Sequence, residues 1–312
     1  MKKILIVLTA MLLLIAACDT DSRPDGSTPF IGGTQGLEIE FLDSFPPPRV
    51  SDGGEDPFDV IIRIKNEGEA NVAPEDVRLT LSGFPSSAFG LSPDNMTKNS
   101  PELIEMNEIN PDGSIVDSVP VEVEFLGFAY QDLVQGNQPF TFRADICYSY
   151  NTRVTSTLCV KEDFRRDVTG DVCAVSATRQ ALNSGAPVQV TSMSQTAAGS
   201  ERTRISFTVA NRGTGHVYEV GRDCASDARR EDRVFVRVLG FDESLGEEIN
   251  CRGLRDSELP NEGFVVLGSE GRVDVTCDIS FDERSPRIQP FSLELHYDYN
   301  KNIQKQVVVE RN

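Results

Sequence analysis

The chain has no tryptophan and only two histidines among its 312 residues, which removes several common kinds of functional site. Without tryptophan, a stacking platform for carbohydrate is not expected. Neither His216 nor His296 lies in a catalytic frame, because the sequence has no Gly-x-Ser-x-Gly elbow, His-Glu-x-x-His motif, P-loop or Gly-x-Gly-x-x-Gly turn. We therefore expect a protein that is not an enzyme and that needs no cofactor.

Positive charge is scarce, since 30 Lys and Arg residues stand against 49 Asp and Glu, for a formal net charge of −19. Binding to nucleic acid requires concentrated Lys and Arg, so no nucleic acid is expected as a partner. The same charge opposes flat binding to an anionic membrane, and a soluble, self-repelling surface is its simplest consequence.

Long apolar runs are absent except at the start of the chain. Residues 1–17 predict a cleaved signal peptide: two lysines precede the apolar run Ile4–Ile15, which is shorter than the about 20 residues of a spanning helix. The segment Ile15-Ala16-Ala17-Cys18 resembles the lipobox of prokaryotic lipoproteins. That resemblance implies acylation of Cys18 and an exported protein anchored to the outer face of the cell membrane. The alternative is an ordinary signal peptide with an incidental cysteine.

Residues 18–35 are rich in Asp, Ser, Gly, Pro and Thr, without apolar periodicity. This composition predicts a lipidated, flexible tether, whose r.m.s. reach as a coil is roughly 23 Å.

Beyond the tether, three landmarks occur twice in the same order. Strands with alternating apolar residues, 58–64 and 204–209, each lead into an Asn-x-Gly turn, at Asn66 and Gly68 and again at Asn211 and Gly213. In these turns Asn can bond backbone groups and Gly can adopt a positive φ. A second strand ending in Gly-Phe and a Gln-Pro-Phe segment before Tyr-x-Tyr-Asn also recur. We interpret the repetition as duplication of one fold.

Short alternating strands without a long helical period predict an all-β protein with two tandem immunoglobulin-like β-sandwich domains. Domain 1 is expected at 36–162, a linker at 163–171 and domain 2 at 172–312. The strand followed by Asn-x-Gly resembles CARDB-type and related immunoglobulin-like modules. Tyr148-Ser149-Tyr150-Asn151 before Cys159, and Ala186-Pro187-Val188, resemble segments of archaeal or bacterial envelope lipoproteins. The resemblance implies a surface scaffold or adhesion role by association only.

Six cysteines follow Cys18, and no Cys-x-x-Cys pair occurs, so disulfides are favoured over metal or thiol chemistry. A turn expected at residues 151–153 would let Cys147–Cys159 staple the last hairpin of domain 1. In domain 2, Cys224 lies in an insertion of about 12 residues relative to domain 1. We favour Cys173–Cys224 and Cys251–Cys277 there, with Cys173–Cys251 and Cys224–Cys277 as the alternative.

Two further kinds of site have weak signals. Residues 52–56 and 167–171 contain acidic turns in which Asp167 and Asp171 are calcium candidates, but neither follows EF-hand spacing, and a solvated turn is favoured. Asn95 begins a glycosylation sequon in a polar loop. The leading interpretation is a non-enzymatic envelope scaffold, spacer or adhesion module whose partners are envelope proteins or glycans. The alternative is a ligand-capturing binding protein, with its site at the domain junction or at the Cys224 insertion.

Overall fold

The computed structural model describes residues 28–312 except 167, 169 and 225–230, and over these residues the chain is all-β, as predicted. Three sheets build most of it. The first outer sheet has the order β1 (Leu37–Phe41), β3 (Phe58–Asn66), β8 (Val121–Phe128). The second outer sheet has the order β10 (Ala177–Thr178), β12 (Val188–Ala197), β13 (Arg202–Asn211), β18 (Arg272–Phe281), β16 (Glu247–Arg252).

The third sheet is shared by both halves of the molecule. Its order is β17 (Glu262–Val266), β15 (Arg233–Leu239), β19 (Arg287–Glu310), β9 (Gln138–Val160), β4 (Val77–Ser82), β5 (Thr97–Asn99). Three short strands add to it: β11 (Leu182–Asn183) on β9, and β14 (His216–Tyr218) and β2 (Arg49–Ser51) on β19. A separate hairpin joins β6 (Glu108–Ile109) to β7 (Ile115–Val116), and short 3-10 turns lie at η1 (Pro74–Asp76), η2 (Ser86–Phe89), η3 (Pro93–Met96) and η4 (Glu243–Leu245).

The repeated strands predicted from alternation are present. The patterns at 58–64 and 204–209 form β3 and β13, and the second landmark forms β4 and β15. In β3 the buried residues alternate strictly with half-buried ones, which is what one face toward the core requires. The sandwich is closed by ring contacts between layers: Phe142 of β9 lies 6.3 Å from Phe58 of β3, between ring centroids.

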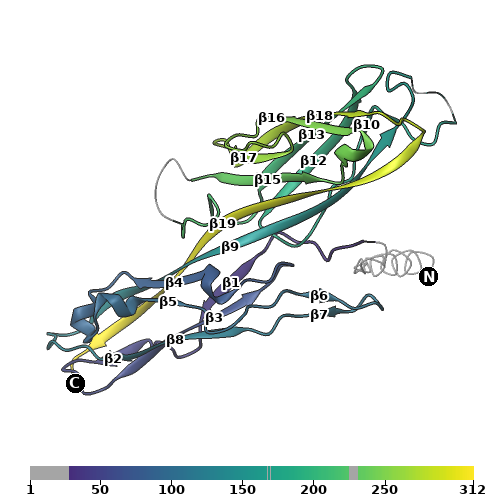
Figure 1. The fold of residues 1–312 in the computed structure, drawn as a ribbon. Helices are drawn as coiled ribbons and strands as arrows, with labels where there is room; N and C mark the ends of the chain where they lie inside the picture. Colours follow the sequence, from purple (N-terminus) through teal and green to yellow (C-terminus); the bar gives the residue numbers. More distant parts are fainter. Residues whose placement is uncertain (1–27, 167, 169, 225–230) are drawn as a thin grey trace, which may run out of the picture.

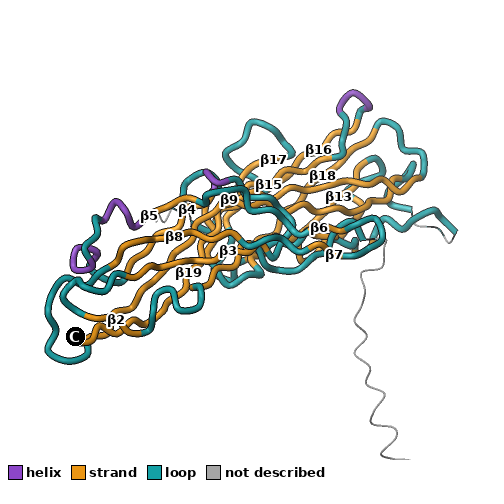
Figure 2. The backbone as a smooth tube through the Cα atoms, turned by 90° about the horizontal axis from the view of Figure 1, so that it is seen from below, coloured by secondary structure: helices purple, strands orange, loops and turns teal. Residues whose placement is uncertain are grey.

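The third landmark forms the two longest strands, β9 and β19, which run side by side along the length of the molecule (Figures 1 and 2). They are antiparallel, and every residue of β9 has a partner in β19, from Gln138 opposite Val309 to Val160 opposite Arg287. This ladder joins the two halves into one continuous sheet.

The hairpin expected at the end of domain 1 is therefore wrong. Residues 151–153 continue β9, and Thr152 is fully buried there, with its hydroxyl donating to the Val188 carbonyl at 2.5 Å. Asn151 pairs with His296 across the ladder. An asparagine that reads as a turn signal in isolation is accommodated here by a strand partner far along the chain.

The domain boundaries at 36–162 and 172–312 also require correction. The second half of β9 lies beside β11 in the second half of the molecule, whereas the end of β19 pairs with β2 in the first half. Each half is thus completed by a strand that begins in the other half, and the buried apolar residues form one cluster through both. The sequence repeats are real, but they do not pack as separate domains.

The segment 163–171 does not join two domains either. It follows the end of β9, at the far end of the second half, where Phe164 packs against Phe281 of β18 at 6.1 Å between ring centroids. Its described residues continue the second half, because β9 has already crossed between the halves.

Candidate functional site at the waist

We call the centre of the β9–β19 ladder, Tyr148–Tyr150 of β9 and Tyr297–Tyr299 of β19, the waist of the molecule. The two tyrosines of each strand are two residues apart, so they face the same side, and all four are buried. Their rings contact one another, with centroids 5.6 Å apart within β9 and 5.9 Å apart between Tyr148 and Tyr299. The waist is therefore a packed aromatic junction.

The second tyrosine of each strand binds the Asn-x-Gly turn of one half. The Tyr150 hydroxyl donates to Asn66 Oδ1 at 2.9 Å, and the Tyr299 hydroxyl donates to Asn211 Oδ1 at 3.2 Å. Each Asn also accepts the backbone N–H two residues on, at 3.0 and 3.1 Å, as predicted. The same contacts thus recur in both halves, which supports the duplication.

The first tyrosine of each strand also makes matching contacts in the two halves. Tyr148 accepts from the Leu37 amide at 3.1 Å, at the start of β1, and Tyr297 accepts from the Val188 amide at 3.3 Å, at the start of β12. Burial raises the pKa of both phenols above its usual value of 10, because an anionic ring would lose its hydration. These hydroxyls stay protonated and hold the outer sheets onto the ladder.

The reason for glycine in the two turns differs from the prediction. Neither Gly68 nor Gly213 has a positive φ. Instead a Cβ at Gly68 would collide with the Tyr150 hydroxyl, and one at Gly213 would collide with the Tyr299 hydroxyl and lie 2.8 Å from Pro187. Glycine is needed because the tyrosine approaches the backbone so closely.

Residues 28–36, which we call the strap, cross the waist before β1 begins. The carboxylate of Glu69, only 6% exposed, accepts three backbone amides: Ile31 and Gly32 of the strap, both at 2.9 Å, and Gly185 of the second half at 2.6 Å. A carboxylate that accepts several N–H groups makes strong, charge-assisted hydrogen bonds. The flexible tether predicted for 18–35 is therefore wrong for this described part.

The strap also contacts the second half directly. The ring of Phe30 lies 5.5 Å from the guanidinium carbon of Arg153, on β9, and the Gly33 carbonyl accepts from the Ala186 amide at 3.3 Å. Glu69 belongs to the first half, so the strap bridges the two halves on one side of the waist.

On the opposite, outer face of the ladder, residues 221–224 of the Cys224 insertion contact the strands. Asp298, 1% exposed, accepts from the Ser149 hydroxyl at 2.6 Å and from the Gly221 and Arg222 amides at 3.1 and 2.8 Å. The repeat places Ser149 where the second copy has Asp298. The carboxylate that only the second copy has therefore binds the loop that only the second copy has. Sequence reasoning missed both Glu69 and Asp298, and this Ser-to-Asp difference between the copies was the available signal for the second.

Three disulfides fix these segments. Cys147 is bonded to Cys224, which ties the insertion to β9, and Cys159 is bonded to Cys173, which ties the end of β9 to the segment after it. Cys251 is bonded to Cys277 across β16 and β18, in the pairing that we favoured.

Both Cys147–Cys159 and Cys173–Cys224 are thus wrong, and so are the alternatives Cys173–Cys251 and Cys224–Cys277. Cys159 lies twelve positions after Cys147 in one continuous strand, a distance of about 40 Å at 3.3 Å per residue, so no bridge can join them. The pairing prediction failed because it depended on the hairpin.

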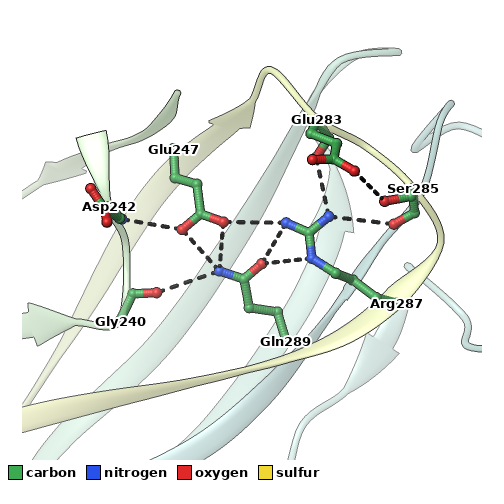
Figure 3. Close-up of polar contacts among 7 residues, drawn as sticks. All are labelled: Gly240, Asp242, Glu247, Glu283, Ser285, Arg287 and Gln289. Atoms are coloured by element: carbon green, nitrogen blue, oxygen red, sulfur yellow. Dashed lines mark hydrogen bonds and ion pairs between the residues drawn. The ribbon is translucent and has the colours of Figure 1, made fainter. Parts of the chain in front are cut away.

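A polar network closes the far end of the second half (Figure 3). Glu247, nearly buried at the start of β16, accepts from Arg287 at 3.2 Å and from Gln289 at 3.1 Å. Beside it, an open groove of about 580 Å³ crosses the outer face of the second sheet. The lining residues are Arg202, Glu243, Glu248, Ile249, Asn250, Pro260, Asp278 and Ser280. The groove has charges of both signs and no aromatic ring.

The calcium candidates are engaged in other contacts where the structure describes them. Asp171 Oδ2 lies 2.6 Å from Lys161 Nζ and accepts the Val168 amide at 2.7 Å, whereas Asp167 lies outside the described residues. In the other acidic turn, the Asn312 and Val134 amides hold the pKa of Asp52 below its usual value. Among the described residues, no group of three or more His, Cys, Asp or Glu side chains could hold a metal ion.

The remaining candidates are dispersed. Asn95 is exposed within η3, so its sequon is accessible. His216 is exposed on β14, and His296 is half-buried on β19, where its Nε2 lies 3.3 Å from Glu294. Cys18 and the signal peptide lie outside the described residues.

No protein-family model matches the chain, and no curated protein matches its sequence. Over the described residues, no helix is both long and apolar enough to cross a membrane.

Proposed function

We propose that this chain is an exported lipoprotein that acts as a rigid, non-enzymatic scaffold or spacer in the cell envelope, built from two immunoglobulin-like halves. The unbroken β9–β19 ladder carries the proposal. Bending at the waist would break backbone hydrogen bonds and expose four buried tyrosines. A protein that keeps partners at a set separation needs this resistance to bending.

The proposed location draws on two separate observations. Three disulfides indicate an oxidising compartment outside the cytoplasm. The lipobox-like segment before Cys18 supports acylation there. Two or three acyl chains hold a protein on a membrane almost permanently, at about 0.8 kcal/mol per buried methylene. We propose other envelope proteins or glycans as partners.

The anchor is tested by expressing the wild-type chain and Cys18→Ser in a lipoprotein-processing bacterium. We expect the wild type in the membrane fraction, with a mature N-terminal peptide that begins at an acylated Cys18, and the variant in the soluble fraction. Equal partition of both proteins would contradict the anchor.

The spacer is tested by small-angle scattering on the purified protein over a range of salt concentrations. A rigid ladder predicts one elongated profile that salt does not change. A profile that requires several interhalf angles would contradict the proposal. Protein cross-linking on intact cells then identifies the partners, with Cys18→Ser as the matched control.

A ligand-capturing protein is the second candidate, and the groove in the second half favours it. The interior of the junction is filled by tyrosine rings, and the described part of the Cys224 insertion is bonded to β9, so neither of the sites predicted for a ligand is supported. Arg202 and Glu248 line the groove and provide polar groups for a glycan. Glycan-array binding that is lost in Arg202→Ala and Glu248→Ala, but kept in Glu105→Ala, would favour this function.

A further inference from the structure

We infer that an anchor at Cys18 would hold the molecule by its waist, so that the long axis lies along the membrane and both ends are free to bind partners. The inference rests on the proposed lipoprotein. It makes the protein a lateral spacer, which separates partners on one membrane surface, rather than a stalk that projects away from the membrane.

The first support is the place where the N-terminal segment joins the folded part. Glu69 of the first half binds the Ile31 and Gly32 amides, and the second half holds Gly33 through Ala186. Figure 1 shows the described chain entering between the two halves, far from the C-terminus at the end of the first half. A force applied at the N-terminus therefore acts on the molecule at the waist.

The second support is length. Ten residues separate Cys18 from Thr28, the first described residue, and ten residues span at most about 35 Å when fully extended. The 23 residues of β9 span about 76 Å, so each end lies about 38 Å from the waist even without the loops beyond the strand. Standing upright on one end would therefore require a tether longer than its full extension, whereas lying along the membrane requires no such extension.

The net charge of −19 adds a constraint on how close the molecule lies. Anionic headgroups repel an acidic surface within about 10 Å, the screening length in 0.1 M salt. The tether, rather than adhesion to the headgroups, would keep the protein at the membrane, and both ends would stay accessible to partners.

Three exposed apolar positions mark the waist and the two ends. Val119, 71% exposed, follows Ser118, whose hydroxyl donates to the Asn66 carbonyl at the waist. Leu133, 82% exposed, precedes Val134, which binds Asp52 at the end of the first half. Ile288, 55% exposed, lies at the end of the second half. Labels at these positions should leave the core intact.

The test places one donor fluorophore at a time at these three positions, by an unnatural amino acid, in lipidated protein on liposomes with headgroup acceptors. We expect energy transfer of similar strength from all three positions, because a molecule whose long axis lies along the membrane keeps its waist and both ends at similar heights above the headgroups. Strong transfer at one end with the weakest at the other would overturn the waist anchor. Protein that fails to bind the liposomes at all would instead contradict the lipoprotein proposal.

A variant pair tests the strap itself. Glu69→Ala removes the acceptor of the Ile31 and Gly32 amides and frees the strap as far as Gly33, which Ala186 still holds, so that the tether grows from 10 to 15 residues and its coil reach rises roughly 1.2-fold. Transfer from position 119 should fall in this variant and stay unchanged in Glu105→Ala, which removes an exposed carboxylate. Circular dichroism confirms that both variants are folded, and unchanged transfer in folded Glu69→Ala would overturn the role of the strap.

Discussion

The two halves of the molecule share their contacts at the waist but differ toward their ends. Both bind a tyrosine hydroxyl to the Asn of an Asn-x-Gly turn and another tyrosine to the first amide of an outer strand. Away from the waist, the first half has a three-stranded outer sheet and the second a five-stranded one. The contacts that join the halves are thus the same in both, whereas the outer sheets differ.

The ends are also stabilised differently. In the first half, Phe142 stacks on Phe84 at 4.1 Å between centroids, and Phe58, Phe89 and Phe128 surround the pair. In the second half the corresponding rings, Phe291 and Phe241, lie 6.0 Å apart with fewer aromatic neighbours, but two disulfides lie in that half. Dense aromatic packing thus stabilises the first half, whereas disulfide cross-links contribute to the stability of the second half.

The largest expected effect comes from the matched phenylalanines. Phe142→Ala should lower the free energy of unfolding by about 5 kcal/mol and Phe291→Ala by about 3 kcal/mol, because the first ring has more packed neighbours to lose. Urea denaturation with the disulfides intact measures both. Equal losses in the free energy of unfolding would mean that the aromatic cluster adds no extra stability to the first half.

An intermediate effect is expected from the disulfide that pairs β16 with β18. Replacing Cys251 and Cys277 by Ala together frees a loop of 26 residues, which should cost about 3.5 kcal/mol in the chain-entropy model. The urea midpoint gives the change, and reducing agent should then shift the double variant less than it shifts the wild type. A double variant as stable as the wild type would contradict the role assigned to cross-links in the second half.

The smallest effect compares the two turn asparagines. Asn66 is fully buried, whereas its counterpart Asn211 is partly exposed. Asn66→Ala therefore leaves backbone and tyrosine groups without a hydrogen-bond partner in a dry site, whereas water can reach the corresponding groups in Asn211→Ala. We expect losses of about 3 and about 1 kcal/mol in thermal or urea unfolding. The reverse order would show that burial does not distinguish the two turns.

Local sequence patterns predicted the strands that have one buried face and the turns that bond within themselves. Alternation at Val60, Ile62 and Ile64 was sufficient for β3, and the repeated Asn-x-Gly predicted both turns with their Asn contacts. The glycine at position 68 was predicted, but for the wrong reason, since its tight contact is with a tyrosine 82 residues away. Glu69 had no local signal, because its three amides belong to segments that only the fold brings to it.

The sequence by itself determined the all-β character, the repeated strands and the two Asn-x-Gly turns, because each depends on side-chain periodicity within a strand or on comparison of two copies. Only the tertiary structure decided that β9 and β19 continue through the waist and exchange between halves, and with that the connectivity of four of the six paired cysteines. Whether a strand ends or continues depends on the partner beside it, and here that partner lies some 150 residues away in the chain.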